Sequence, residues 1–149
     1  MSSQAWHERL SALDATFLYM EDRNAHMHVG GLCTFEGPPP SHAELLQHVE
    51  ARLTEVPRYR QRLAFVPLGQ GRPVWVDDAQ FDLEYHVRRT ALPAPGGETE
   101  LQRLTSRLMS QRLDRDKPLW ELWCVEGLGE GRFALFSKTH HCMIDGISG

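Results

Sequence analysis

The sequence predicts an α/β (α+β) fold in which a mixed β-sheet is flanked by helices. Two kinds of segment alternate along the chain: β-rich stretches, and stretches in which apolar residues recur at helical spacing. Hydrophobic residues make up 41% of the 149 residues, enough for the core of one ordinary domain. Helices and strands that interleave in this way are typical of a sheet covered by helices.

Three helix starts are predicted from a Ser or Thr followed three residues later by an acidic residue or Gln. The hydroxyl caps the open amides of the first turn, and the later side chain reaches back to the cap. These pairs are Ser11 with Asp14, Ser41 with Glu44, and Thr99 with Gln102. Two of the helices are amphipathic, so each is expected to bury one side.

The apolar stripes define how far these two helices run. The stripe after Ser41 ends before Pro57, which cannot continue a helix; its members are Leu45, Leu46, Val49, Leu53 and Val56. The stripe after Thr99 consists of Leu101, Leu104, Leu108 and Leu113.

Six strands are predicted from β-branched and aromatic residues between turn signals. They cover 26–36, 61–67, 72–77, 81–88, 119–126 and 131–140. The segments 37–40 (GPPP) and 92–97 (LPAPGG) are expected to be loops. Trp120 and Trp123 lie three residues apart in a predicted strand, so we expect core residues on opposite faces of the sheet.

Composition excludes several classes of function. The formal net charge is −4, without the dense Lys/Arg face that binding to nucleic acid requires. No apolar run approaches the length of a membrane helix, and no secretion leader opens the chain, so neither a spanning segment nor export is expected. Cys33, Cys124 and Cys142 form no CxxC pair, which favours a reducing, cytoplasmic compartment over a disulfide framework or a zinc site.

The segment KTHHCMIDGISG (138–149) holds the densest titratable chemistry. In an extended strand the side chains alternate, which places His141 on the face of Ser137 and Thr139 and places His140 on the opposite face. The two imidazoles therefore cannot converge on one metal ion. His141 lies on the face with small hydroxyl residues, where a ligand has room, and a neutral imidazole is a common general base.

The residues around His141 allow more than one interpretation. Asp145 can either fix the ring or nearby backbone by hydrogen bonding or cap a following helix. Gly146 permits a sharp turn or close approach of a ligand. A purely structural histidine pair remains an alternative, whereas a Cys142–His141 nucleophile is disfavoured because adjacent side chains rarely meet.

The string HHxxxDG, formed by His140, His141, Asp145 and Gly146, resembles the active-site motif of the CoA-dependent acyltransferase superfamily. That group includes chloramphenicol acetyltransferase, carnitine acyltransferases and condensation domains of peptide synthetases. Three segments narrow the resemblance to the N-terminal part of bacterial wax ester synthase/diacylglycerol acyltransferases. They are 10–22, 27–37 and 117–149, the last including Pro118-Leu119-Trp120.

The resemblance implies a two-lobed acyltransferase with a mixed sheet in each lobe and a tunnel between the lobes. Residues 1–149 would be the N-terminal lobe, ending just after the motif. We therefore expect this chain to be the N-terminal piece of a longer polypeptide. The absent C-terminal lobe would belong to the same protein, either continuous with this chain or as a separate chain.

The resemblance also implies the chemistry. His141 would be the general base that takes the proton of a diacylglycerol or long-chain alcohol hydroxyl as its oxygen attacks the thioester of acyl-CoA. No acyl-enzyme, metal or cofactor is expected, and acyl-CoA is a co-substrate. Asp145 would organise the loop, His140 would support it, and Gly146 would keep the tunnel floor open, with Ser137 and Thr139 also near the substrate.

Other residues carry weaker expectations. Arg58, Arg60 and Arg62 would form a basic stripe for CoA phosphates if extended, although a solvated face is favoured. A metal or substrate role for His26 and His28 is weighed against a surface or lobe-interface position, and the second is favoured. The alternative functions are a related acyltransferase with another acceptor, a non-catalytic half that binds lipid or a partner, and, more distantly, a metal-dependent hydrolase.

Because the expected products are insoluble in water, we expect peripheral contact with the inner membrane or with lipid inclusions from the cytoplasmic side. The helix within 41–56 could supply an amphipathic face for this contact. Packing of that helix on the sheet is the more frequent outcome.

Overall fold

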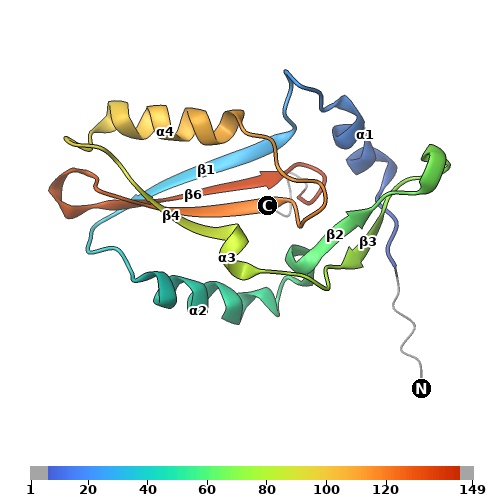
Figure 1. The fold of residues 1–149 in the computed structure, drawn as a ribbon, viewed down its shortest axis with the longest axis horizontal. Helices are drawn as coiled ribbons and strands as arrows, with labels where there is room; N and C mark the ends of the chain where they lie inside the picture. The colour runs from blue at the N-terminus through green and yellow to red at the C-terminus, as the bar shows by residue number, and fades with distance from the viewer. Residues whose placement is uncertain (1–6, 145–149) are drawn as a thin grey trace.

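A four-stranded mixed sheet with helices on both faces forms the body of the molecule (Figure 1). The computed structural model describes residues 7–144. The strand order is β1 (His28–Phe35), β6 (Phe133–His140), β5 (Trp120–Glu126) and β4 (Val87–Ala91). β6 pairs antiparallel with β1 and β5, whereas β4 and β5 are parallel. The predicted fold class is confirmed.

Two of the three predicted helix caps are present. Ser11 caps α1 (Ala12–Met20) by accepting a hydrogen bond from the Asp14 amide at 3.0 Å. Ser41 caps α2 (His42–Leu53) in the same way, and the Glu44 carboxylate accepts from the Ser41 amide at 2.8 Å. This reciprocal pair is the capping box expected from the sequence.

The third predicted cap is wrong by two residues. α4 (Glu98–Ser110) begins after Gly97, and Thr99 lies inside the helix. The Glu100 carboxylate accepts from the Gly97 amide at 2.8 Å, so an acidic residue at the third helical position satisfies the open end without a hydroxyl.

α4 and α2 cover opposite faces of the sheet (Figure 1). On the α4 face, Leu101, Leu104 and Leu108 pack against sheet residues that include Phe136 and Val125. On the α2 face, Leu45 and Leu53 pack with Trp120 and Cys124. Trp123 packs against the α4 side, so the two tryptophans lie on opposite faces as predicted.

Two members of the predicted stripes lie elsewhere. Val56 follows the end of α2 and is 43% exposed. Leu113 follows the end of α4 and is buried in a third cluster together with Leu10, Leu18 and Leu119. This cluster also contains Cys142, so it joins α1 to the turn that carries the histidine motif.

The predicted strand 81–88 is wrong, because this segment begins with a short helix. Asp82 accepts a hydrogen bond from the Glu84 amide at 3.0 Å and caps α3 (Leu83–His86), after which β4 starts. The other predicted strands are present. β2 (Gln61–Ala64) and β3 (Val74–Asp77) form a separate antiparallel hairpin, as the turn signals between them indicate.

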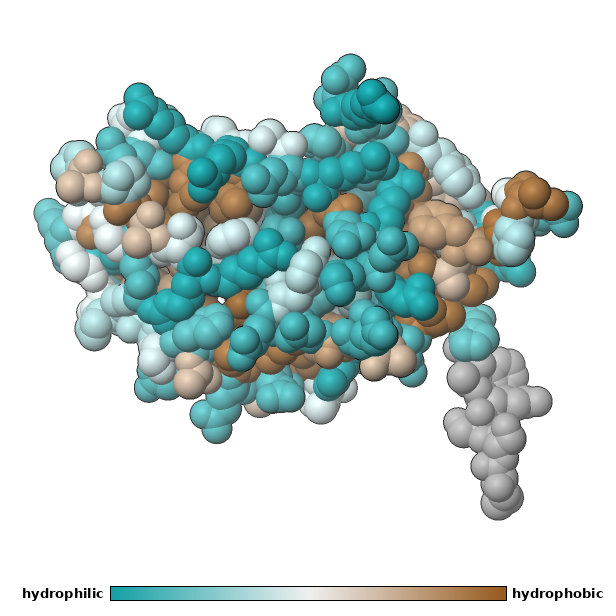
Figure 2. All heavy atoms as spheres, in the orientation of Figure 1, coloured by the Kyte–Doolittle hydropathy of each residue, from teal (hydrophilic) through white to brown (hydrophobic). Residues whose placement is uncertain are grey.

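The β2–β3 hairpin projects from one end of the molecule, and its tip is apolar (Figures 1 and 2). Leu68 at the tip is 93% exposed, and Phe65 is 48% exposed. No helix within residues 7–144 has the length and apolar character needed to cross a membrane.

Candidate active site

The histidine motif lies at the end of β6, next to the centre of the sheet. Side chains alternate along β6 as predicted: Ser137 and Thr139 face the α2 side, and Lys138 and His140 are completely buried on the α4 side. The regular strand ends at His140, so His141 lies in the following turn and not in the strand. Asp145 and Gly146 lie outside the described residues.

His141 is held by its backbone and by one face of its ring. Its amide donates to the Met27 carbonyl at 2.8 Å. Its ring stacks on Phe17 of α1, with 3.9 Å between the ring centroids. Within residues 7–144, no group hydrogen-bonds to its Nδ1, although this atom is shielded from solvent. The imidazole is thus oriented by packing, with Nδ1 buried and unpaired within the described part of the chain, and His141 itself does not line the neighbouring cavity.

His140 has a different environment. Its Nδ1 accepts a hydrogen bond from the Cys142 amide at 3.1 Å. Its Nε2 lies 3.3 Å from Oε2 of Glu21 but off the line that a hydrogen bond requires. Burial lowers the pKa of His140 to about 4, against the attraction of the Glu21 carboxylate. His140 is therefore neutral at physiological pH, and its side chain is completely buried.

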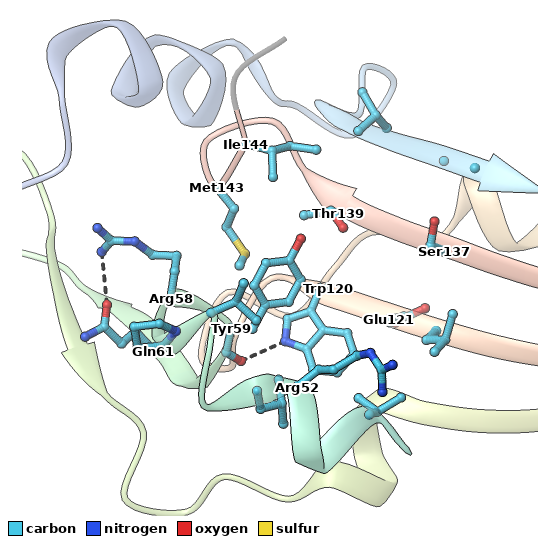
Figure 3. Close-up of a pocket in the computed structure, with 18 of the residues that line it drawn as sticks. Arg52, Arg58, Tyr59, Gln61, Trp120, Glu121, Ser137, Thr139, Met143 and Ile144 are labelled. Atoms are coloured by element: carbon cyan, nitrogen blue, oxygen red, sulfur yellow. Dashed lines mark hydrogen bonds between the residues drawn. The ribbon is translucent and has the colours of Figure 1, made fainter. Parts of the chain in front are cut away.

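An apolar cavity of about 870 Å³ adjoins the motif on the α2 side (Figure 3). Ser137 and Thr139 from β6 line it, as do Met143 and Ile144 from the segment that follows His141. The opposite wall comes from α2 and the 3₁₀ helix Pro57–Arg60. The Trp120 indole, whose Nε1 donates to the Tyr59 carbonyl at 2.8 Å, forms part of the floor.

Ser137 and Thr139 are thus brought together in one cavity, next to the turn that carries His141. Arg52 and Arg58 contribute positive charge to the same cavity. An elongated apolar space with a few polar groups is the usual form of a small-molecule site.

The basic stripe that Arg58, Arg60 and Arg62 would make if extended, the less favoured of the two interpretations, does not form, because Arg58 and Arg60 lie in the 3₁₀ helix and each arginine has its own partner. Arg58 pairs with Glu8 and packs over the Trp75 ring. Arg60 lies over the Phe81 ring, and Arg62 is 3.9 Å from Asp78. The change from the 3₁₀ helix at Arg58 and Arg60 to strand β2 at Arg62 breaks the regular alternation that a basic stripe would need.

Cys142 is not an activated nucleophile. Its side chain is buried, and burial raises the pKa of the thiol to about 12. His28 is buried and its Nε2 lies 2.7 Å from the Met109 carbonyl, while its ring stacks on His26. These contacts account for His28 as a structural residue.

Sequence reasoning missed Phe17, Glu21 and Met27 as neighbours of the motif. All three lie in segments quoted for the family resemblance or between them, yet no local pattern singles them out. Their contacts with the motif join residues more than a hundred positions apart in the sequence, so only the folded chain reveals them.

Residues 10–149 match the family model described as the wax ester synthase/diacylglycerol acyltransferase catalytic domain. The chain belongs to this family. Two Mycobacterium tuberculosis relatives, named "Probable diacyglycerol O-acyltransferase" tgs3 and tgs1, are each 47% identical to it, over 142 and 141 residues. The matches cover 94% of this chain and 52% of tgs3, and 93% of this chain and 30% of tgs1. The chain thus spans about half, or less, of the length of these relatives.

Solved structures agree with the family assignment. The wax ester synthase/diacylglycerol acyltransferase from Marinobacter aquaeolei VT8 is 38% identical, with a TM-score of 0.76 over 94% of this chain and 36% of that chain. The first condensation domain of the calcium-dependent antibiotic synthetase has a TM-score of 0.75 at 20% identity, over 97% of this chain and 36% of that one, which shows the fold alone. The predicted family and fold class are therefore confirmed.

Proposed function

We propose that the full-length protein is an acyl-CoA-dependent O-acyltransferase. It would transfer a long-chain acyl group to diacylglycerol, giving triacylglycerol, or to a long-chain alcohol, giving a wax ester. One observation supports this activity above the others: in a chain of this family, His141 lies in a turn beside an apolar cavity and has an unbonded ring nitrogen within the described part of the chain.

In the proposed reaction, His141 accepts the proton of the acceptor hydroxyl while that oxygen attacks the thioester carbonyl. The tetrahedral intermediate collapses by breaking the carbon–sulfur bond. The imidazolium then returns its proton to the departing CoA thiolate, so that the ester and free CoA thiol leave. No bond forms between enzyme and acyl group, and a general base of this kind contributes about 100- to 10,000-fold in rate.

The cavity is the proposed place for the hydrocarbon part of a substrate. Its walls are mainly apolar, and its polar members include the hydroxyls of Ser137 and Thr139 near the motif. A hydrocarbon chain would be stabilised there by removal from water. A C-terminal lobe, corresponding to the part of the relatives that this chain does not span, would complete the site.

Thiol release provides the test. The full-length protein, mixed with palmitoyl-CoA and either a diacylglycerol or hexadecanol, should release free thiol, and His141→Ala should lower the rate by about 100- to 10,000-fold. His42→Ala is the matched control, since His42 is also half-buried with an unbonded Nδ1 but lies at the start of α2. Undiminished release by His141→Ala would remove His141 from the mechanism.

The same assay separates the alternatives. Binding of palmitoyl-CoA without turnover by the wild-type protein would favour a non-catalytic lipid-binding half. A panel of acceptors, including carrier-bound amines, would reveal a related acyltransferase with another acceptor.

We also propose that the apolar tip of the β2–β3 hairpin provides peripheral contact with lipid. Leu68 and Phe65 project from this tip, a short wedge of the kind that inserts at the interface of a bilayer. Replacing both with Ser should release the full-length protein from sedimenting lipid vesicles. Leu32→Ser is a control of similar exposure, 43%, on β1, and equal release by this control would contradict the assignment to the tip.

A further inference from the structure

Glu21, directly after α1, is a buried carboxylate at which several segments of the chain meet. Its side chain is 1% exposed. Oε1 accepts hydrogen bonds from Arg112 and Arg115, each at 3.0 Å. Oε2 accepts from the Met27 amide at 3.1 Å and lies 3.3 Å from His140 Nε2. Four residues from three other parts of the sequence thus surround one side chain.

Met27 links this carboxylate to the backbone of His141. The Met27 amide donates to Glu21, and the Met27 carbonyl accepts from the His141 amide at 2.8 Å. Without the carboxylate, the half-buried Met27 amide would lose its partner, and the segment before β1 would be less constrained. The position of the His141 backbone depends on this segment.

Helix α1 provides a second link. Arg115, which holds Glu21, also donates to the Leu18 carbonyl at 2.8 Å. Phe17, the residue before Leu18, stacks on the His141 ring. The ion pair therefore fastens the helix that supplies the aromatic surface under the imidazole.

His140 provides a third link, because its ring lies between the Glu21 carboxylate and the Cys142 amide, just after His141. Because Nδ1 accepts from the Cys142 amide, a neutral ring carries its proton on Nε2, toward Glu21. Within residues 7–144, the other charged or titratable groups that influence it are Arg115 and His28. The negative charge of Glu21, 3.3 Å from Nε2, favours a proton on this nitrogen by electrostatic attraction, which leaves Nδ1 free to accept from the Cys142 amide.

We propose that Glu21 is a positioning residue of the active site, which holds His141 in place through Met27, α1 and His140. This rests on the proposed acyltransferase activity. The competing interpretation is a buried ion pair that affects folding only, since the loss of one partner of such a pair is itself destabilising.

Kinetics of the full-length protein distinguish the two interpretations. Glu21→Gln keeps the shape of the side chain but removes its charge, and the expected result is a fall in kcat of about 100-fold, the size associated with misplacing a catalytic group by about 1 Å. The KM for palmitoyl-CoA should stay within about 2-fold, because the lost contact concerns the base and not the binding of the thioester. Each variant is assayed well below its own melting temperature.

Asp78→Asn is the matched control. Asp78 is also a largely buried carboxylate, with its side chain 8% exposed, that faces an arginine and accepts a backbone amide, but it touches none of the residues around the motif. Its kcat should stay within about 2-fold of the wild type. A folded Glu21→Gln protein with wild-type kcat, or an equal loss of kcat in both variants, would overturn the role of Glu21.

A measurement on the wild type guards against a Glu21→Gln protein that does not fold. In protein labelled with ¹⁵N-histidine, with His140 assigned through His140→Gln, the ring should show the Nε2–H tautomer at neutral pH. An Nδ1–H tautomer would contradict the link through His140. A wild-type protein that releases no thiol would contradict the proposed acyltransferase activity instead, so the two failures are distinguishable.

Discussion

The two faces of the central sheet differ in whether their polar side chains are buried or border an open cavity. On the α4 face, charged and titratable side chains are buried: Lys138 and His140 are 0% exposed, and Glu121 is 8% exposed. On the α2 face, the same strand presents Ser137 and Thr139 to an open apolar cavity. The α4 face therefore holds the end of β6 through buried polar contacts, whereas the α2 face borders an open cavity.

Lys138 shows how the enclosed face is stabilised. Its Nζ donates to the carbonyls of Leu108 and Gln111, both at 2.8 Å, and lies 3.5 Å from the Glu121 carboxylate. These carbonyls belong to the C-terminal end of α4 and the residue after it, where helix carbonyls lack partners and the helix dipole favours a cation. Burial lowers the pKa of Lys138, while Glu121 acts in the opposite direction. The lysine joins the helix end to the central strand.

The largest expected effect tests this enclosed face. Lys138→Met should lower the free energy of unfolding by about 3–5 kcal/mol, because it removes two hydrogen bonds to backbone carbonyls and the nearest positive charge beside the buried Glu121 carboxylate. Urea unfolding of the full-length protein measures the change. Lys117→Met, which removes only a partly exposed ammonium over the Tyr85 ring, should cost about 1 kcal/mol or less. Equal losses in the two variants would contradict the role assigned to Lys138.

A second prediction concerns pH. A histidine in the unfolded chain titrates near 6.5, whereas the pKa of His140 in the folded protein is about 4. Between pH 6.5 and 4 the unfolded chain binds a proton that the folded protein does not, so the free energy of unfolding should fall by about 3 kcal/mol as the pH is lowered across this window. Below about pH 4 this contribution stops changing.

Glu21 extends the same trend to lower pH. Burial raises its pKa, but hydrogen bonds from Met27, Arg112 and Arg115 outweigh burial and lower it to about 2, against an ordinary 4.5. Its stabilisation of the folded state is present above pH 4.5 and is lost as the pH falls toward 2.

Urea unfolding at a series of pH values from 7 to 4 tests the contribution of His140. The free energy of unfolding should change less with pH for His140→Gln than for the wild type. An unchanged slope would mean that the acid sensitivity arises elsewhere.

The smallest expected effect tests the open face. Ser137→Phe places a large ring in the cavity and should lower turnover of palmitoyl-CoA by about 10-fold, with a smaller effect on a short-chain acyl-CoA, since a few methylene groups are worth about 1–3 kcal/mol in an apolar pocket. Ser106→Phe, on the exposed side of α4, is the matched control. The same loss for both chain lengths would show that the cavity does not hold the acyl chain.

Several elements could be predicted from short stretches of sequence. Ser11 and Ser41 act on residues three positions away, so their caps are visible in the sequence itself. The alternation of Ser137, Lys138, Thr139 and His140 is a property of any strand and was predicted correctly. The prediction failed at two places. A strand was predicted over 81–88, where Asp82 instead caps a short helix. The start of α4 was predicted at Thr99, two residues after its actual cap, Gly97.

The sequence by itself determined the family, the order of helices and strands apart from α3, and the alternation of side chains along β6, because the signals for these lie in short stretches of the chain. Only the tertiary structure decided which groups surround the histidines. Glu21 meets Arg112 and Arg115 across 91 and 94 residues. Contacts at such separations arise from the packing of α1 against the end of the sheet, and no local pattern of residues specifies them.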